Sequence, residues 1–117
     1  MDDTTLAELT ALAIRFRDER DWKQFHNPKD MALSLALESA EVLELMQWKN
    51  GEELQRHLEA HRARLGEELS DVLFWVLAMA NDFSIDLGEA FKQKLIKNAQ
   101  KYPIDKAKGV STKYTEL

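Results

Sequence analysis

Four carboxylates in two short motifs carry the clearest chemical signal in this sequence. Glu38-Ser-Ala-Glu41 comes first, and Glu68-Leu-Ser-Asp71 follows in the second half of the chain. The acids of each motif stand three positions apart, so both would point to the same side of an α-helix. Apolar residues surround both motifs, where a carboxylate is costly unless a cation neutralises it. Acids that converge from facing helices are how a helical bundle builds a divalent metal site.

The alternative is that these acids are solvated or paired with a base on the same helix. The positions four residues after each acid hold no base; they are Val42, Leu45, Val72 and Trp75. Unpaired carboxylates in one place would repel one another. Mg²⁺ prefers oxygen ligands, keeps several waters and commonly binds substrate phosphates. We therefore expect a Mg²⁺ site that serves phosphoanhydride chemistry.

A nucleotide substrate would also need cationic groups for its phosphates and a platform for its base. Lys94, Asn98 and Lys101 share one face of the last predicted helix, although lysines at a helix C-terminus are also favoured by the dipole. Stacking a base on an aromatic ring is worth roughly 1–3 kcal/mol. The aromatic candidates could instead belong to the core. They are Trp22, Phe25, Trp48 and Trp75.

Other reaction classes find little support. His57 and His61 stand in a strongly polar segment without the His-Glu-x-x-His order, and we interpret them as surface residues. No glycine-lysine phosphate loop is present, and no histidine is placed in sequence to activate Ser39 or Ser70. The Glu-x-x-His pairs of di-iron bundles are also absent.

Size and composition indicate an ordinary soluble domain. The chain has 117 residues, of which 44% are hydrophobic and 32% charged, with a net charge of −5. Interspersed charges without a basic stripe argue against nucleic-acid binding. The absence of cysteine excludes disulfides and thiol catalysis. No secretory signal and no apolar run of about 20 residues is found, so we expect a cytoplasmic protein that contacts no membrane.

Caps, glycines and prolines predict an all-α bundle of four to five helices. A first helix should run from Thr5 to about Arg20, with Leu6, Leu9, Ala13 and Phe16 facing inward, and a loop should cover 21–27. A second helix should run from Pro28 to about Trp48. A third stretch should start near Glu52 and either break at Gly66 or continue to about Phe83. The last helix should run from Asp86 to about Tyr102. The domain should cover 1–103, followed by a polar tail over 104–117 that is mobile unless a partner or substrate orders it.

Helical projection at about 100° per residue places the acids relative to the core faces. Glu38 and Glu41 interrupt a stripe that would otherwise be core, and Trp48 would lie on its edge. Glu68 and Asp71 flank the apolar stripe of the later helix, and Trp75 projects between their directions. The stripe residues of the two helices are Leu35, Val42 and Leu45, and Leu69, Val72, Leu73, Val76, Leu77 and Ala80. Apolar faces this broad favour a dimer or tetramer.

These motifs resemble the all-α nucleoside triphosphate pyrophosphohydrolases of the MazG-like superfamily. The resemblance covers nearly the whole chain and is greatest to the dCTP pyrophosphatase branch. The segments that carry it are Arg20-Asp-Trp-Lys-Gln-Phe-His-Asn-Pro28, Glu44-Leu-Met-Gln-Trp48, Glu67-Glu-Leu-Ser-Asp-Val-Leu73 and Lys113-Tyr-Thr-Glu-Leu117, together with the two acid motifs.

The resemblance implies hydrolysis between the α and β phosphates of dCTP or a modified dCTP, which gives a monophosphate and pyrophosphate and cleanses the nucleotide pool. It implies Mg²⁺ held by Glu38, Glu41, Glu68 and Asp71, and a homodimer or homotetramer with sites near subunit interfaces. It assigns the substrate contacts to Trp22, Phe25, His26, Trp48, Trp75, Lys94 and Asn98. Ala13 and Trp75 stand where vertebrate relatives have histidine and tyrosine, which bears on base preference.

Two other functions remain open at this point. One is a non-catalytic helical oligomer that binds nucleotides or a protein partner, with structural acids. The other is a dUTP or dUDP diphosphohydrolase, which product identity would separate because such enzymes also accept diphosphates. The helper base also stays open between the four acids and Glu67.

Overall fold

The computed structural model describes all 117 residues and contains six α-helices, two short 3₁₀ helices and no strand, which confirms the predicted all-α class. The elements are α1 (Leu6–Asp18), η1 (Lys23–Phe25), α2 (Pro28–Glu44), α3 (Gly51–Ala60), α4 (Arg62–Asp82), α5 (Leu87–Lys101), α6 (Ile104–Ala107) and η2 (Tyr114–Glu116). They form two compact units, Met1–Ser84 and Ile85–Leu117. None of the helices has the length and apolar character needed to cross a membrane.

Three helices begin at the caps that the sequence predicts. The side-chain oxygens of Thr5, Asn27 and Asp86 accept a hydrogen bond from the backbone N–H three residues further on, at 3.2, 2.9 and 3.0 Å. Each bond satisfies a backbone donor that the first helical turn leaves without a partner. Local sequence therefore fixes where α1, α2 and α5 start.

The predicted end of α2 is wrong. The helix ends at Glu44 rather than near Trp48, and turns follow it. Leu45 is only 6% exposed, so it enters the core at the point where the helix stops. Trp48 has a φ of +68°, a left-handed conformation that an α-helix excludes. Packing of the turn, which no proline or glycine marks in the sequence, ends this helix.

The break in the following helical stretch lies at His61, not at Gly66. His61 has φ −116° and ψ +31°, and it separates α3 from α4. Gly66 lies inside α4, where a glycine costs only about 1 kcal/mol relative to alanine. The packing of a 21-residue helix offsets that cost easily.

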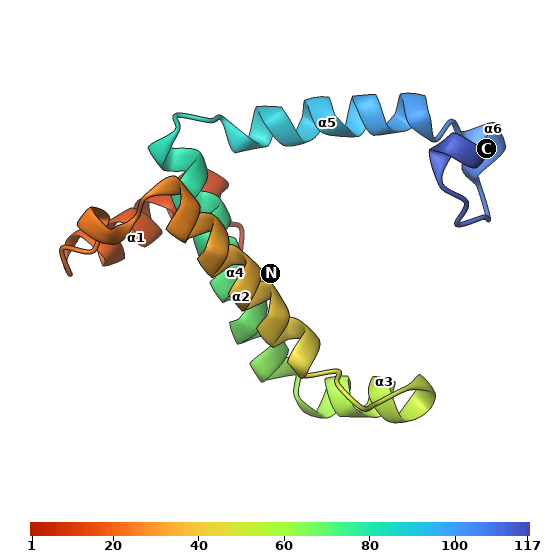
Figure 1. Cartoon of the computed structure of the whole chain (residues 1–117), viewed down its shortest axis with the longest axis horizontal. Coiled ribbons are helices and arrows are strands. Elements are labelled where there is room, and N and C mark those ends of the chain that lie inside the picture. The colour runs from red at the N-terminus through yellow and green to blue at the C-terminus, as the bar shows by residue number, and fades with distance from the viewer. The chain divides into compact units, whose positions relative to one another are not determined.

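The first unit is built around α2 and α4, which lie antiparallel and side by side, with α1 crossing α4 (Figure 1). Its buried apolar residues are Ala13, Met31, Leu45, Leu77, Ala78 and Ala80. The predicted inner face of α1 is only partly correct, because Leu6 and Phe16 are 42% and 43% exposed. Arg17 is buried instead, which the apolar pattern of the sequence does not predict.

The second unit contains α5 and the segment that follows it. Residues 104–117, predicted as a polar tail, contain the short helices α6 and η2. The rings of Tyr102 and Tyr114 meet edge to face with centroids 5.8 Å apart, and Lys101 Nζ lies 4.8 Å from the centre of the Tyr114 ring. These contacts hold the end of the chain against the end of α5.

Candidate metal centre and adjoining pocket

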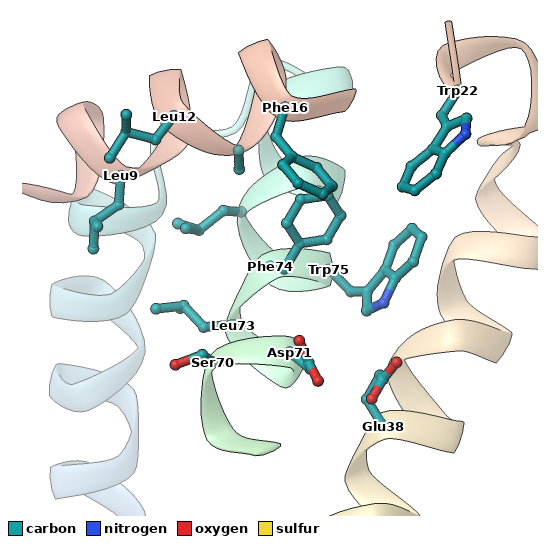
Figure 2. A pocket seen from close by; sticks show the side chains of 12 residues that line it. Leu9, Leu12, Phe16, Trp22, Glu38, Ser70, Asp71, Leu73, Phe74 and Trp75 are labelled. Carbon is teal, nitrogen blue, oxygen red and sulfur yellow. The ribbon is translucent and has the colours of Figure 1, made fainter. Parts of the chain in front are cut away.

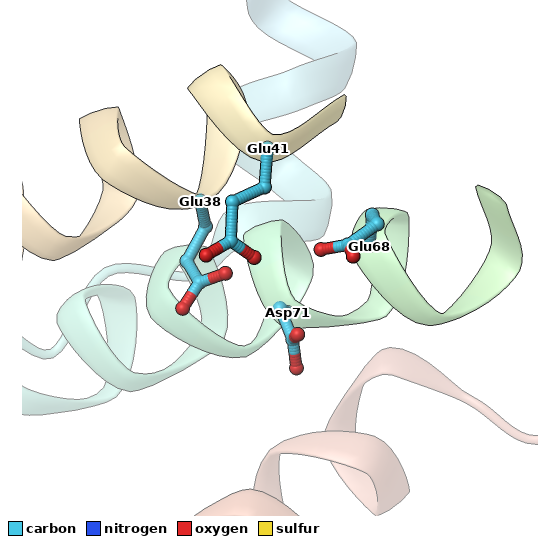
Figure 3. Close-up of side chains that lie close together, drawn as sticks. All are labelled: Glu38, Glu41, Glu68 and Asp71. Carbon is cyan, nitrogen blue, oxygen red and sulfur yellow. The ribbon is translucent and has the colours of Figure 1, made fainter. Parts of the chain in front are cut away.

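The structure brings the four motif carboxylates together. Glu38 and Glu41 extend from α2 toward α4, which contributes Glu68 and Asp71 (Figure 3). One carboxylate oxygen from each residue lies within 4.8 Å of the corresponding atoms of the other three. The antiparallel pairing of α2 and α4 places the two motifs at the same level, so the cluster follows directly from the fold.

The cluster has too few positive partners within the protein. Glu38 Oε2 and Glu68 Oε2 are buried and have no hydrogen-bond partner. Arg64 stands one turn before Glu68 and places its Nε 3.8 Å from Glu68 Oε1. The residues that follow each acid in the sequence do not include this cation. Its side chain is 63% exposed, so the contact is screened by water. A divalent cation with a preference for oxygen ligands fits this donor set.

Titration of Glu68 reflects the crowding of these acids. A hydrogen bond with the Glu41 carboxyl group raises the pKa of Glu68, and burial and the negative charges of Glu41 and Asp71 raise it further, while Arg64 acts in the opposite direction. Holding on to a proton lowers the repulsion within the cluster. A bound cation would remove the same repulsion and release that proton.

We expect the variant Glu68→Gln to stabilise the metal-free protein at pH 7 and to have a smaller effect at pH 5. The pKa of Glu68 is higher in the folded than in the unfolded state, so the folded wild type gains stability as pH falls through the folded pKa. Glutamine removes both the charge and this pH dependence. Thermal unfolding of wild type and Glu68→Gln in EDTA at several pH values would measure the difference in stability, with the exposed Glu59→Gln as control. A variant that is less stable than wild type at pH 7 would contradict the prediction.

An apolar pocket of about 550 Å³ adjoins the acid cluster within the first unit (Figure 2). Helix α1 crosses one side of it, α4 forms the adjacent wall, and Glu38 and Asp71 lie at its acidic end. Its volume is in the range of small-molecule sites, roughly 300–1,000 Å³. The pocket is lined by Leu9, Leu12, Ala13, Phe16, Trp22, Glu38, Ser70, Asp71, Leu73, Phe74, Trp75 and Leu77.

Only some of the aromatic residues predicted to contact the base lie at the pocket. Trp22 and Trp75 both line the pocket, and the His26 ring lies 4.9 Å from that of Trp75. Burial and the nearby charge of Arg17 lower the pKa of His26, and its Nδ1 is buried without a partner. Phe25 and Trp48 are 63% and 88% exposed, and neither lines the pocket.

The remaining predicted substrate residues belong to the second unit. Lys94 and Asn98 stand four positions apart on α5 and therefore share one side of that helix. Lys94 is exposed and Asn98 is half-buried. The first unit contains neither of them, so its acid cluster and pocket are formed without their side chains.

Several pocket residues escaped the sequence interpretation. Leu9 and Phe16 were expected in the core of α1, and Leu73 in the stripe of α4, yet all three border the pocket. Leu12 and Phe74 lie beside the predicted stripes rather than on them, and they also line the pocket. Helical periodicity marks an apolar face but cannot tell a filled core from the wall of a cavity.

Comparison with known proteins gives consistent similarities. Residues 33–117 match the MazG-like family. The chain is 41% identical to dCTP pyrophosphatase 1 from Mus musculus and 42% identical to that from Homo sapiens, in each case over 98% of this chain and 69% of the relative. The fold is also similar to that of a pyrophosphatase from Archaeoglobus fulgidus, with a TM-score of 0.81 and 36% identity over 88% of this chain and 96% of that one.

Proposed function

The chain belongs to the MazG-like family, and on this basis we propose that it is a nucleotide pyrophosphohydrolase that converts dCTP, or a modified dCTP, to the monophosphate and pyrophosphate. Glu38, Glu41, Glu68 and Asp71 hold the metal ions that the reaction requires, and the family relationship points to Mg²⁺. Removal of non-standard nucleotides from the nucleotide pool is the role that this activity would serve.

The observation that carries this proposal is the continuity between the acid cluster and the pocket. Glu38 and Asp71 belong to both, while Trp22 and Trp75 lie in the aromatic part of the same pocket. A nucleotide has a flat base at one end and a chain of phosphates at the other. The pocket offers a matching apolar end for the base and an acidic, cation-binding end for the phosphates.

Each group has a defined task in this scheme. The four carboxylates would hold Mg²⁺, which would neutralise phosphate charge and make a water molecule a better nucleophile. Trp22 and Trp75 stack the base, and the apolar side chains of α1 exclude water from it. With the base held there, the α-phosphate would lie nearest the acidic end of the pocket, and cleavage of its bond to the β-phosphate would release pyrophosphate.

The other predicted contacts complete the proposal. Lys94 and Asn98 would neutralise and orient the phosphates, as their side chains share one face of α5. His26 borders Trp75 and would contact the base or sugar from the pocket edge. Phe25 and Trp48 are exposed in the single chain, so their contribution would require another subunit or substrate to cover them.

A panel of common and 5-modified deoxynucleoside triphosphates, incubated with Mg²⁺, tests this function. Ion-exchange chromatography of the products should give a monophosphate and pyrophosphate, with the highest kcat/KM for dCTP or a 5-substituted form. Preferred turnover of dUTP and dUDP would assign the diphosphohydrolase activity instead. Tight binding without turnover would support the non-catalytic alternative.

Replacing Trp75 by alanine should weaken nucleotide binding. Loss of one base-stacking contact is expected to raise KM for dCTP by about five- to 100-fold, with a smaller change in kcat. Trp75→Phe keeps an aromatic face and should remain within about fivefold of wild type. Steady-state kinetics measure the effect, and thermal unfolding checks that the fold is retained. An unchanged KM in Trp75→Ala would exclude Trp75 from the base site.

We also propose that the protein assembles as a homodimer or homotetramer. The large apolar side chains of Leu33, Leu37 and Leu43 on α2 are 54%, 59% and 68% exposed. Exposed leucines in such number on one helix favour association with another subunit. Light scattering coupled to size-exclusion chromatography should give a mass of two or four chains, and a monomer would contradict this part of the proposal.

A further inference from the structure

A buried charge cluster joins the end of α1 to the end of α4, away from the acid motifs. Arg17 is 3% exposed, and its Nη1 donates to both carboxylate oxygens of Asp82 at 2.9 Å. The Asp82 side chain is itself only 7% exposed. Lys23 adds a second cation from the edge of the cluster, with its side chain 55% exposed and its Nζ 3.1 Å from Asp82 Oδ2. Charge-assisted bonds to a buried carboxylate are strong and geometrically specific.

The Lys23 contact ties a second chain segment to this cluster. Lys23 is the first residue of η1, and the preceding Trp22 donates its backbone N–H to the carbonyl oxygen of Arg17 at 3.1 Å. Asp21, directly before Trp22, adopts a left-handed φ of +55°, a conformation that aspartate tolerates better than most residues other than glycine. Gln24 Nε2 donates to the Asp21 backbone oxygen and to Asp21 Oδ2, both at 3.0 Å, so local bonds and the two anchors together hold this chain reversal.

This segment borders the pocket at two places. The Trp22 side chain lines the pocket directly (Figure 2). The His26 ring, at the other end of η1, contacts that of Trp75, which lines the pocket from α4. A shift of η1 would therefore move Trp22, which lines the pocket. It would also break the contact between His26 and Trp75, which lines the pocket from α4.

Asp82 cannot take part in metal binding. It stands eleven positions after Asp71 on the same helix, which corresponds to roughly 16 Å along the axis. It does not belong to the carboxylate group that could hold an ion. Its effect on the pocket must pass through the residues that it contacts.

We propose that the ion pair between Asp82 and Lys23 fixes the Trp22–His26 segment in the conformation that receives the nucleotide base, which makes Lys23 a positioning residue for substrate binding. This inference rests on the proposed function, because it assigns the pocket to the base. Arg17 supplies the buried charge that keeps Asp82 ionised and oriented when Lys23 is changed.

The test compares Lys23→Met, Lys23→Arg and Lys29→Met with wild type in the full chain. Lys29 is the matched control, because it pairs with Asp30 at 3.2 Å on the surface and does not reach α4. Steady-state kinetics with dCTP and Mg²⁺ give KM and kcat, and hydrogen exchange of the backbone amides of 21–27 reports the order of the segment.

For Lys23→Met we expect KM to rise roughly three- to tenfold, with kcat changed by less than about twofold, and faster exchange in residues 22–26. Lys23→Arg should restore both properties, and Lys29→Met should match wild type. Wild-type KM in Lys23→Met would overturn the inference, even if exchange becomes faster. If wild type hydrolyses no nucleotide, the proposed function fails first, and the exchange data alone still show whether Lys23 orders the segment.

Discussion

Glu38→Gln is expected to reduce the turnover of dCTP by at least about 100-fold while leaving the fold intact. Changing a residue that merely supports a metal ligand typically costs about 10- to 100-fold, so the loss of a ligand should cost no less. Glutamine has nearly the same shape as glutamate but is a weaker ligand for a hard cation. Because Glu38 Oε2 is buried without a hydrogen-bond partner, the substitution breaks no bond within the protein.

Stability measurements separate this catalytic effect from misfolding. Without metal, Glu38→Gln should unfold at the same or a higher temperature than wild type, because one charge leaves a repelling cluster. With Mg²⁺, wild type should gain more stability than the variant, since a ligand that binds only the folded state stabilises it. Glu59→Gln, on the exposed surface of α3, should behave as wild type in both assays. Full activity of Glu38→Gln would remove the acid cluster from the mechanism.

Asp82→Ala is expected to destabilise the protein by about 3–5 kcal/mol, the largest stability effect of any single substitution considered for this chain. Arg17 is 3% exposed, and alanine would remove both of its short bonds to Asp82, leaving only the longer contact of its Nε with Asp18 Oδ1 at 3.5 Å. Denaturant unfolding at fixed protein concentration, followed by circular dichroism, would measure the free energy of unfolding. The double variant Arg17→Met/Asp82→Leu should recover most of the loss, because it removes both charges.

The matched surface pair is Arg15 and Glu19, whose side chains are 76% and 62% exposed and lie 3.5 Å apart. Glu19→Ala should cost less than about 1 kcal/mol. Equal losses for Asp82→Ala and Glu19→Ala would show that the Arg17–Asp82 pair contributes no more than a surface contact.

The contribution of Asp82 should also vanish in acid. Burial alone would raise the pKa of Asp82, but its bonds with Arg17, Lys23 and Asn81 outweigh burial, so the pKa is lowered. With a folded pKa below the unfolded value of about 3.9, the stabilisation is present above that value and is lost as pH falls through the folded pKa. The difference in stability between wild type and Asp82→Ala should therefore shrink below about pH 4.

Local sequence predicts much of this fold because several of its signals act within one helical turn. Thr5, Asn27 and Asp86 cap their helices through bonds to backbone groups three residues away, so no distant part of the chain decides them. The convergence of the acids also follows from simple geometry. Each motif places its two acids on one side of a helix, so the four carboxylates lie close together where α2 and α4 pair with the motifs at the same level.

The features that sequence could not predict depend on tertiary contacts. Helix α2 ends where Leu45 is buried, and no proline or glycine at this position predicts that end from the sequence. Arg17 lies on the same face of α1 as Ala13, where the sequence pattern favours an apolar residue. Its burial depends on the ion pair with Asp82, which lies 65 positions away in the sequence. Arg64 precedes Glu68 by one turn, so the residues that follow each acid in the sequence do not reveal it.

The most direct test of the central claim is a ³¹P NMR time course of dCTP with the purified full chain and Mg²⁺, run in parallel with Glu38→Gln. The account predicts that the signals of dCTP are replaced by those of dCMP and pyrophosphate in equal amounts, and that the variant shows almost no conversion. Formation of dCDP and phosphate, or an unchanged spectrum of every triphosphate tested with folded wild-type protein, would contradict it.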